Sequence, residues 1–230
     1  MDLKELGNVN PNTHWYYQSK YIFMRNAITT LSQTREKCLV EVGAGSGFFS
    51  NQLATEFKFR EVIQIDTNYA EAHRITFEGF ARYNVCPHLS GDIYLFIDVV
   101  EHVPNPLEFL AHYISEAREG STFVITVPAF QFLWSDHDIY LGHFKRYTVR
   151  DLVLLATEAG LMVEKANYIF ALLFPIAFLQ RKLVRKFKNG SAIQESSKFT
   201  NLVLMLINRF EAKVITNQRY GLSVLLVAHT

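Results

Sequence analysis

Residues 43–47 read Gly-Ala-Gly-Ser-Gly and directly follow the short apolar run Cys38–Val42. After this turn, Phe49, Leu53 and Phe57 recur at the spacing of one helical face. Glycines between a strand and a helix let the backbone turn sharply and approach a ligand with no Cβ in the way. A strand, a glycine turn and a helix in this order predict the first unit of a parallel α/β sheet.

Apolar runs and helical patterns continue to alternate along the chain. The further strand-like runs are Val62–Ile65, Ile93–Ile97, Ser121–Val127, Leu161–Tyr168 and Leu222–Ala228. Helices are expected over about 70–83, from Pro106 to Gly120, and over Val149–Ala159. The sequence therefore predicts one Rossmann-like α/β domain with a mainly parallel sheet of six or seven strands, helices on both faces, and an antiparallel C-terminal edge strand. A further strand between the runs Val62–Ile65 and Ile93–Ile97 is expected to be short or missing, because few residues remain for it.

The start of one helix is marked with particular clarity. Asn105 is suited to cap it, Pro106 to occupy its first position, and Glu108 to complete a capping pair. Gly120 is suited to the left-handed conformation that ends a helix.

Composition narrows the class of protein. The 230 residues suffice for one α/β domain, and 49% hydrophobic with 20% charged residues indicates a packed globular chain. A net charge of +1 argues against nucleic acid as a partner, and Cys38 and Cys86 are too few for a disulfide framework or a zinc site. Met1–Val9 is polar, unlike a signal peptide, and no apolar run has the length of a membrane span. We therefore expect a cytoplasmic location.

Two acidic residues flank the glycine turn. Glu41 lies inside the first run, where a carboxylate would repel a pyrophosphate but suits a ligand with an amino group. Asp66 ends the second run, 23 residues after Gly43, and is placed to accept hydrogen bonds from a ribose diol. These features favour a nucleoside that carries an amino acid over a dinucleotide.

Residues 40–47 resemble the first motif of class I S-adenosylmethionine-dependent methyltransferases, and residues 64–66 resemble their ribose-binding second motif. Residues 97–103, which read Ile-Asp-Val-Val-Glu-His-Val, are similar to a motif of one large branch of these enzymes. Residues 14–20 and 127–148 resemble further segments of bacterial members that are often associated with glycan or lipid-linked sugar assembly. The resemblance covers about residues 14–168.

This resemblance implies a Rossmann-like class I methyltransferase fold that binds S-adenosylmethionine and releases S-adenosylhomocysteine. It implies that Glu41 lies near the cofactor's amino group, that Asp66 holds the ribose hydroxyls, and that Asp98 with Val99 borders the sulfonium. The cofactor-binding residues implied are Glu41, Gly43, Ala44, Gly45, Gly47, Asp66, Thr67, Asp98 and Val99.

Side chains suited to acid–base chemistry follow the runs Ile93–Ile97 and Ser121–Val127, at the sheet edge where open α/β folds bind ligands. Methyl transfer to a hydroxyl needs positioning and the removal of a proton. The candidate catalytic residues are Glu101, His102 and His143. Three interpretations stay open.

In the first interpretation, His102 acts as a general base. In the second, Asp98 or Glu101 holds a divalent metal together with His102 and His143, as similar motifs do in ubiquinone-pathway and small-RNA methyltransferases. In the third, Glu101 and His102 only cap and orient the following loop.

We divide the chain into an N-terminal helical lid (1–36), a cofactor-binding core (37–168), and a helical insertion with the final strand (169–230). Residues 169–179 are almost wholly apolar, and five basic residues follow by residue 188. The preferred interpretation of 169–188 is a core or substrate-pocket helix, and the other is peripheral contact with an anionic membrane. A later apolar stripe is expected to cover the sheet or a partner subunit; its members are Phe199, Leu202, Val203, Leu206, Ile207, Phe210 and Val214.

The function expected from these features is methyl transfer, to an oxygen of a small-molecule acceptor or of a glycan or lipid-linked one. One alternative is a nucleic-acid 2′-O-methyltransferase, against which the near-neutral charge argues. The other is a binding protein that keeps the fold but has lost catalysis.

Overall fold

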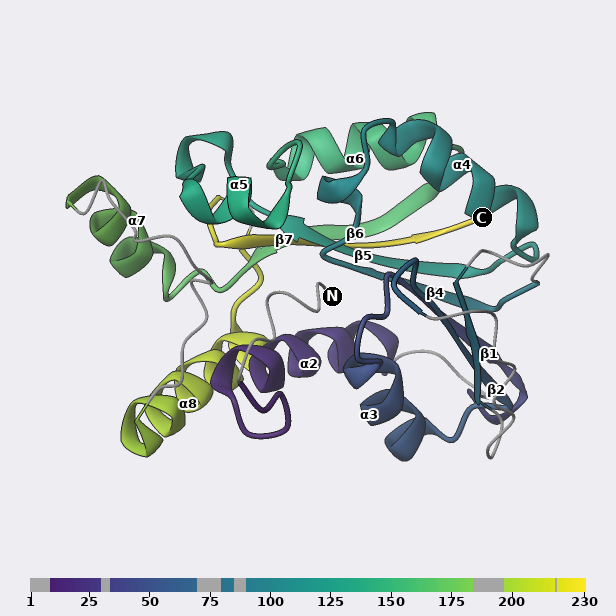
Figure 1. Ribbon diagram of the computed structural model, residues 1–230, viewed down its shortest axis with the longest axis horizontal. Coiled ribbons are helices and arrows are strands. Elements are labelled where there is room, and N and C mark those ends of the chain that lie inside the picture. Colours follow the sequence, from purple (N-terminus) through teal and green to yellow (C-terminus); the bar gives the residue numbers. More distant parts are fainter. Residues whose placement is uncertain (1–8, 30–33, 70–79, 85–89, 184–196, 218) are drawn as a thin grey trace.

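The computed structural model describes residues 9–29, 34–69, 80–84, 90–183, 197–217 and 219–230. Within these ranges the chain forms one seven-stranded sheet in the order β3-β2-β1-β4-β5-β7-β6 (Figure 1). The strands are β1 (Cys38–Val42), β2 (Glu61–Ile65), β3 (Phe80–Tyr83), β4 (Ile93–Ile97), β5 (Thr122–Pro128), β6 (Met162–Ile169) and β7 (Ser223–His229). The first five strands are parallel, and β7 runs antiparallel to both of its neighbours.

Helices cover both faces of this sheet, as predicted (Figure 1). The α-helices are α2 (Trp15–Ile28), α3 (Phe48–Phe57), α4 (Pro106–Glu116), α5 (Asp136–Leu141), α6 (Val149–Glu158), α7 (Phe174–Leu183) and α8 (Lys198–Val214). Three short 3₁₀ turns are η1 (Thr34–Glu36), η2 (Val100–His102) and η3 (Gln131–Leu133). Among the described residues, none of the helices has both the length and the hydropathy that crossing a bilayer requires.

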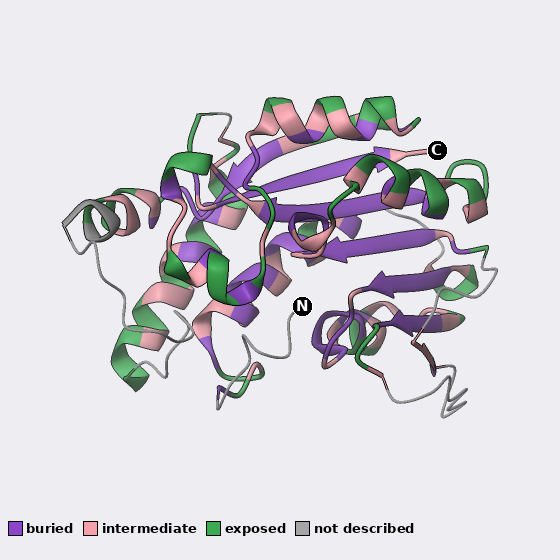
Figure 2. Ribbon diagram, turned by 45° about the horizontal axis from the view of Figure 1, so that its top comes forward, coloured by how far each residue is buried: buried purple, intermediate pink, exposed green. Residues whose placement is uncertain are grey.

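Alternate side chains of each central strand enter two separate cores. In β4, Tyr94 and Phe96 pack with α4 and α6, while Leu95 packs with α2 and α3 on the opposite face. All five residues of β4 are buried, which is why this strand reads as a continuous apolar run. Figure 2 shows the same layering, with buried strands between helices whose outer sides are exposed.

The C-terminal strand is antiparallel, as predicted, but its predicted place at the sheet edge is wrong. β7 lies between β5 and β6, and β6 forms the edge. Burial explains the order, because β7 is buried from Ser223 to Ala228, whereas Met162, Glu164 and Lys165 of β6 are exposed. A continuous apolar strand needs neighbours and cover on both sides.

The interval between β2 and β4 also differs in detail from the prediction. The helix expected over 70–83 is wrong at its end, since Phe80–Tyr83 is strand β3 and pairs in parallel with β2. Residues 70–79 lie outside the described residues. The expectation of a short third strand is confirmed, because β3 has four residues.

The helix predicted from Pro106 begins as expected but ends earlier. Asn105 accepts a hydrogen bond from the backbone N–H of Glu108 and Pro106 is the first residue, whereas the helix ends at Glu116 rather than at Gly120. The chain leaves the helix at Ala117, whose backbone is extended, and Gly120 then takes its positive φ of 75° in the turn before β5.

Candidate functional site

The carboxyl ends of β1, β2 and β4 lie side by side. Val42, the last residue of β1, is in register with Ile65, the last residue of β2, and with Phe96 of β4. The chain therefore leaves β1 and β2 at the same sheet edge, with Gly43 and Asp66 as the next residues. The strand order reverses between β1 and β4, and in open α/β sheets such a point is where ligands bind.

The glycine turn has backbone geometry that a side chain would disturb. Gly43, Gly45 and Gly47 all have positive φ, at 66°, 55° and 72°. A Cβ on Gly43 would overlap the side chain of Val99, and one on Gly47 would overlap Gln64. Ala44 is fully buried, and its N–H donates to the carbonyl of Ile65 at 3.0 Å. The turn is therefore closely packed against β2 and the end of β4.

Glu41 is fully buried beneath this turn, and its two carboxylate oxygens differ in their hydrogen bonding. Its Oε2 accepts a hydrogen bond from the backbone N–H of Ser50 at 3.0 Å, whereas Oε1 has no hydrogen-bond partner among the described residues. Burial raises the pKa of Glu41 above its ordinary value. A buried carboxylate with a vacant acceptor fits a ligand that brings a cationic amino group.

Asp66 joins the glycine turn to β2. Its Oδ2 accepts from the N–H of Gly45 at 2.7 Å, and its Oδ1 accepts from the N–H of Asn68 at 2.9 Å. Asp66 is 7% exposed, while the neighbouring Thr67 is exposed. Oδ1 also accepts from the side-chain amide of Asn68 at 3.0 Å, whereas Oδ2 has a further lone pair, so Asp66 retains an acceptor for a ligand hydroxyl.

Asp98 follows β4 with a positive φ of 52°, a conformation that non-glycine residues seldom adopt. Its Oδ1 accepts from Thr126 Oγ1 at 3.1 Å, and its Oδ2 accepts from Tyr16 Oη at 3.2 Å and from the Lys20 ammonium. Burial alone would raise the pKa of Asp98, but the charge and hydrogen bond of Lys20 hold it below its ordinary value. Helix α2 thus contributes two side chains to this sheet edge.

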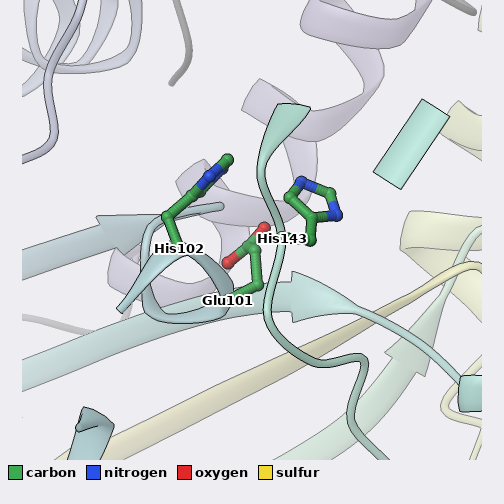
Figure 3. Close-up of side chains that lie close together, drawn as sticks. All are labelled: Glu101, His102 and His143. Carbon is green, nitrogen blue, oxygen red and sulfur yellow. The ribbon is translucent and has the colours of Figure 1, made fainter. Parts of the chain in front are cut away.

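The three predicted catalytic residues come together. One ligand-capable atom from each of Glu101, His102 and His143 lies within 4.8 Å of the others. The two imidazole rings meet edge to face with centroids 4.6 Å apart. Figure 3 shows the Glu101 carboxyl group between the two rings, with Glu101 and His102 on the η2 turn and His143 on the segment after α5. The backbone N–H of Phe144 donates to the carbonyl of Glu101 at 2.7 Å and joins these two segments.

Glu101 itself is buried without a hydrogen-bond partner for either carboxyl oxygen among the described residues. Burial, with the charge of Asp98, raises the pKa of Glu101 well above its ordinary value. A carboxyl group in this position accepts a proton readily or receives a cation.

His143 is oriented by a buried aspartate. Its Nδ1 lies 2.8 Å from Oδ1 of Asp138, which also receives Nε of Arg146 at 2.7 Å. Burial opposes ionisation of Asp138, but hydrogen bonds from His143 and Arg146 and the arginine charge hold its pKa well below the ordinary value. Because an ionised carboxylate only accepts, His143 donates from Nδ1, and in the neutral imidazole this leaves the lone pair on Nε2.

Three contributors to the site were not chosen as site residues from the sequence: Lys20, Asp138 and Arg146. The signal for Lys20 was its position four residues after Tyr16, one helical turn along α2. Asp138 precedes His143 by five residues and Arg146 by eight, with a helix end between them, so only the fold brings the three together.

Comparison with known proteins gives two kinds of match. A family model described as "Methyltransferase domain" matches residues 15–166. No curated protein matches the sequence. Among solved structures, an S-adenosylmethionine-dependent methyltransferase from Archaeoglobus fulgidus superposes with a TM-score of 0.55 at 18% identity, covering 92% of this chain and 94% of that one.

Two further structures extend this comparison. An S-adenosylmethionine-dependent methyltransferase from Mesorhizobium loti has a TM-score of 0.59 at 11% identity and covers 96% of this chain and 100% of its own. The plantazolicin methyltransferase BamL, solved with S-adenosylhomocysteine and a desmethyl-plantazolicin analogue, has a TM-score of 0.53 at 11% identity and covers 96% and 85%. At these identities the structures show a shared fold.

Proposed function

Because the chain belongs to the methyltransferase-domain family, we propose that it transfers the methyl group of S-adenosylmethionine to a hydroxyl oxygen of a small-molecule, glycan or lipid-linked acceptor. The family and the fold are those of class I S-adenosylmethionine-dependent methyltransferases.

The residues at the carboxyl ends of β1 and β2 fit this cofactor. Glu41 would hold the amino group through its vacant Oε1, and Asp66 would accept from the ribose hydroxyls. The glycine turn, with Ala44, would lie against the ligand without side-chain interference, and Thr67, Asp98 and Val99 would border it. The cofactor supplies a methyl group that is already activated by its sulfonium, so the protein's task is to position the acceptor and remove its proton.

The observation that carries the proposal of an oxygen acceptor is the hydrogen bond between His143 and ionised Asp138. It leaves Nε2 of His143 able to take a proton from an acceptor hydroxyl, and Asp138 stabilises the resulting imidazolium. Glu101 and His102 line the same space and would orient the hydroxyl. Helix α2, part of the lid expected at 1–36, would close the site from the side of Asp98.

A second candidate role for the same cluster is a divalent-metal site. Glu101, His102 and His143 together offer a carboxylate and two imidazoles, a ligand set that suits several divalent metals. Asp138 would then orient the metal-binding imidazole from behind, as carboxylates commonly do.

Two experiments test these proposals. Calorimetry should detect binding of S-adenosylmethionine and S-adenosylhomocysteine by the wild-type chain, and binding of NAD instead of these ligands would overturn the assignment.

In the second experiment, release of S-adenosylhomocysteine is measured with phenolic and sugar-hydroxyl acceptors. His143→Ala should lower kcat by about 10²–10⁴-fold, while His112→Ala, an exposed histidine of α4, should not. Loss of turnover in EDTA, restored by Mg²⁺ or Mn²⁺, would favour the metal role.

A further inference from the structure

Helix α8 presents its apolar residues to solvent. Six of the seven residues of the predicted stripe are between 37% and 77% exposed, namely Phe199, Leu202, Val203, Leu206, Phe210 and Val214, and only Ile207 packs against the core. At 3.6 residues per turn these six lie within an arc of about 120° along the whole helix. The expectation that the stripe covers the sheet is therefore wrong.

The opposite side of α8 is fixed against the protein by polar groups. Asn201 accepts from the N–H of Trp15 and donates to the carbonyl of Thr13, both at 2.7 Å. The buried Glu211 carboxylate accepts from the N–H groups of Ala171 and Leu172 at 2.8 and 3.0 Å. Rotating α8 to bury the stripe would break these hydrogen bonds and leave the Glu211 carboxylate without these partners. The hydrogen bonds of Asn201 and Glu211 therefore keep the apolar side of α8 facing outward.

The exposed charged residues of α8 have one sign. Lys198, Arg209 and Lys213 are exposed on α8, and its single acidic residue is the buried Glu211. In the sequence as a whole, residues 169–220 carry nine of the 23 Lys and Arg but two of the 22 Asp and Glu, so this stretch has a net charge of +7 in a chain of net +1.

An exposed apolar stripe flanked by cations is typical of a helix that lies in the interface of an anionic bilayer. A second copy of the chain fits less well, because a two-fold contact through α8 would place the basic residues of each copy against those of the other. We propose that the apolar side of α8 docks this protein on the surface of an anionic lipid membrane.

This surface lies at the same end of the molecule as the candidate site. In both views α7 and α8 lie at the end of the sheet toward which β5 runs (Figures 1 and 2). Rings of α7 also touch the segment after β5, since Phe132 contacts Phe174 and Phe178 with centroids 6.4 and 6.0 Å apart. Docking would bring the carboxyl edge of the sheet close to acceptors held in the bilayer.

Co-sedimentation of the full chain with vesicles tests the proposal, and neither cofactor nor turnover is needed. The chain should bind vesicles rich in phosphatidylglycerol, bind pure phosphatidylcholine at least tenfold more weakly, and dissociate at about 1 M salt, where the Debye length is about 3 Å. Leu206→Glu combined with Phe210→Glu should weaken binding at least tenfold. Leu154→Glu on α6 is the matched control, because Leu154 and Leu206 are 56% and 54% exposed.

A third variant tests the charges. Arg209→Gln combined with Lys213→Gln should weaken binding to the anionic vesicles about fivefold for each residue, with little change for neutral ones. Wild-type chain that ignores anionic vesicles, or binding that Leu206→Glu with Phe210→Glu leaves intact, would overturn the proposal. Light scattering that shows a dimer dissociated by the same pair of changes would assign the surface to self-association instead.

Discussion

Lys20 and Asp98 form an ion pair that joins α2 to the end of β4 across 78 positions of the sequence. The Lys20 side chain is fully buried, and the Asp98 side chain is 14% exposed. Tyr16, one helical turn before Lys20, donates to the same oxygen of Asp98. The segment before the first strand is thereby fixed at the point where the chain leaves the centre of the sheet.

Lys20→Met is expected to lower the free energy of unfolding by about 3–5 kcal/mol, because it leaves a largely buried carboxylate without its cation. Lys20 depresses the pKa of Asp98, so this stabilisation is present above the unfolded value of about 3.9 and is lost as the pH falls through the folded value. Urea unfolding at several pH values measures both effects. The difference between wild type and variant should narrow in acid, and Asp98→Asn should recover part of the loss.

Glu41→Gln is expected to weaken S-adenosylmethionine binding by at least tenfold, because a neutral amide cannot pair with the ligand's ammonium group. The amide oxygen still accepts from the N–H of Ser50, so the melting temperature without ligand should change little. Calorimetry measures the affinity. Glu61→Gln, at the start of β2 and thus at the other end of the sheet, is the control and should bind as wild type does.

Gly43→Ala separates backbone strain from steric overlap. Gly43 and Gly120 both have positive φ, at 66° and 75°, but a Cβ would meet Val99 only at Gly43 and finds no atom within 4 Å at Gly120. Chemical denaturation should show a loss of about 1 kcal/mol for Gly120→Ala and about 1–3 kcal/mol more for Gly43→Ala. Adding Val99→Ala should restore part of the extra loss, and equal losses for the two glycine variants would contradict the packing described for the turn.

The meeting of Glu41, the glycine turn and Asp66 at one sheet edge was predictable because each of these sequence signals is local. Glu41, the glycine turn and Asp66 each lie within a few residues of a strand end, and parallel strands carry their ends to one edge. The juxtaposition of Glu101, His102 and His143 also followed from the residues after β4 and β5. For Glu101 and His102 a strand end with a short continuation determines the position, whereas His143 reaches the site only after η3 and α5.

The remaining features depend on contacts between distant segments. To predict that β7 lies inside the sheet, one must know that β6 forms the edge, where its polar side chains are exposed. The outward stripe of α8 reverses the usual rule that apolar faces are buried, because Asn201 and Glu211 bind backbone groups of other segments. Hydrophobic periodicity shows that α8 has two faces but does not show which one meets the protein.

The pair Asp138 and Arg146 provides a last prediction. Arg146 donates to both Asp138 oxygens, at 2.7 and 3.1 Å, and to the carbonyl of Ala129 at 3.1 Å. Asp138→Leu should lower the free energy of unfolding by about 3–5 kcal/mol, because it leaves the buried Arg146 guanidinium without its carboxylate. Combining Asp138→Leu with Arg146→Met should lower the free energy of unfolding by clearly less than the sum of the two single changes. Urea denaturation of all four proteins measures the coupling. The double variant also lacks the hydrogen-bond acceptor for His143, so it should fold but lose turnover. A double variant with wild-type kcat would show that catalysis does not need Asp138 to orient His143.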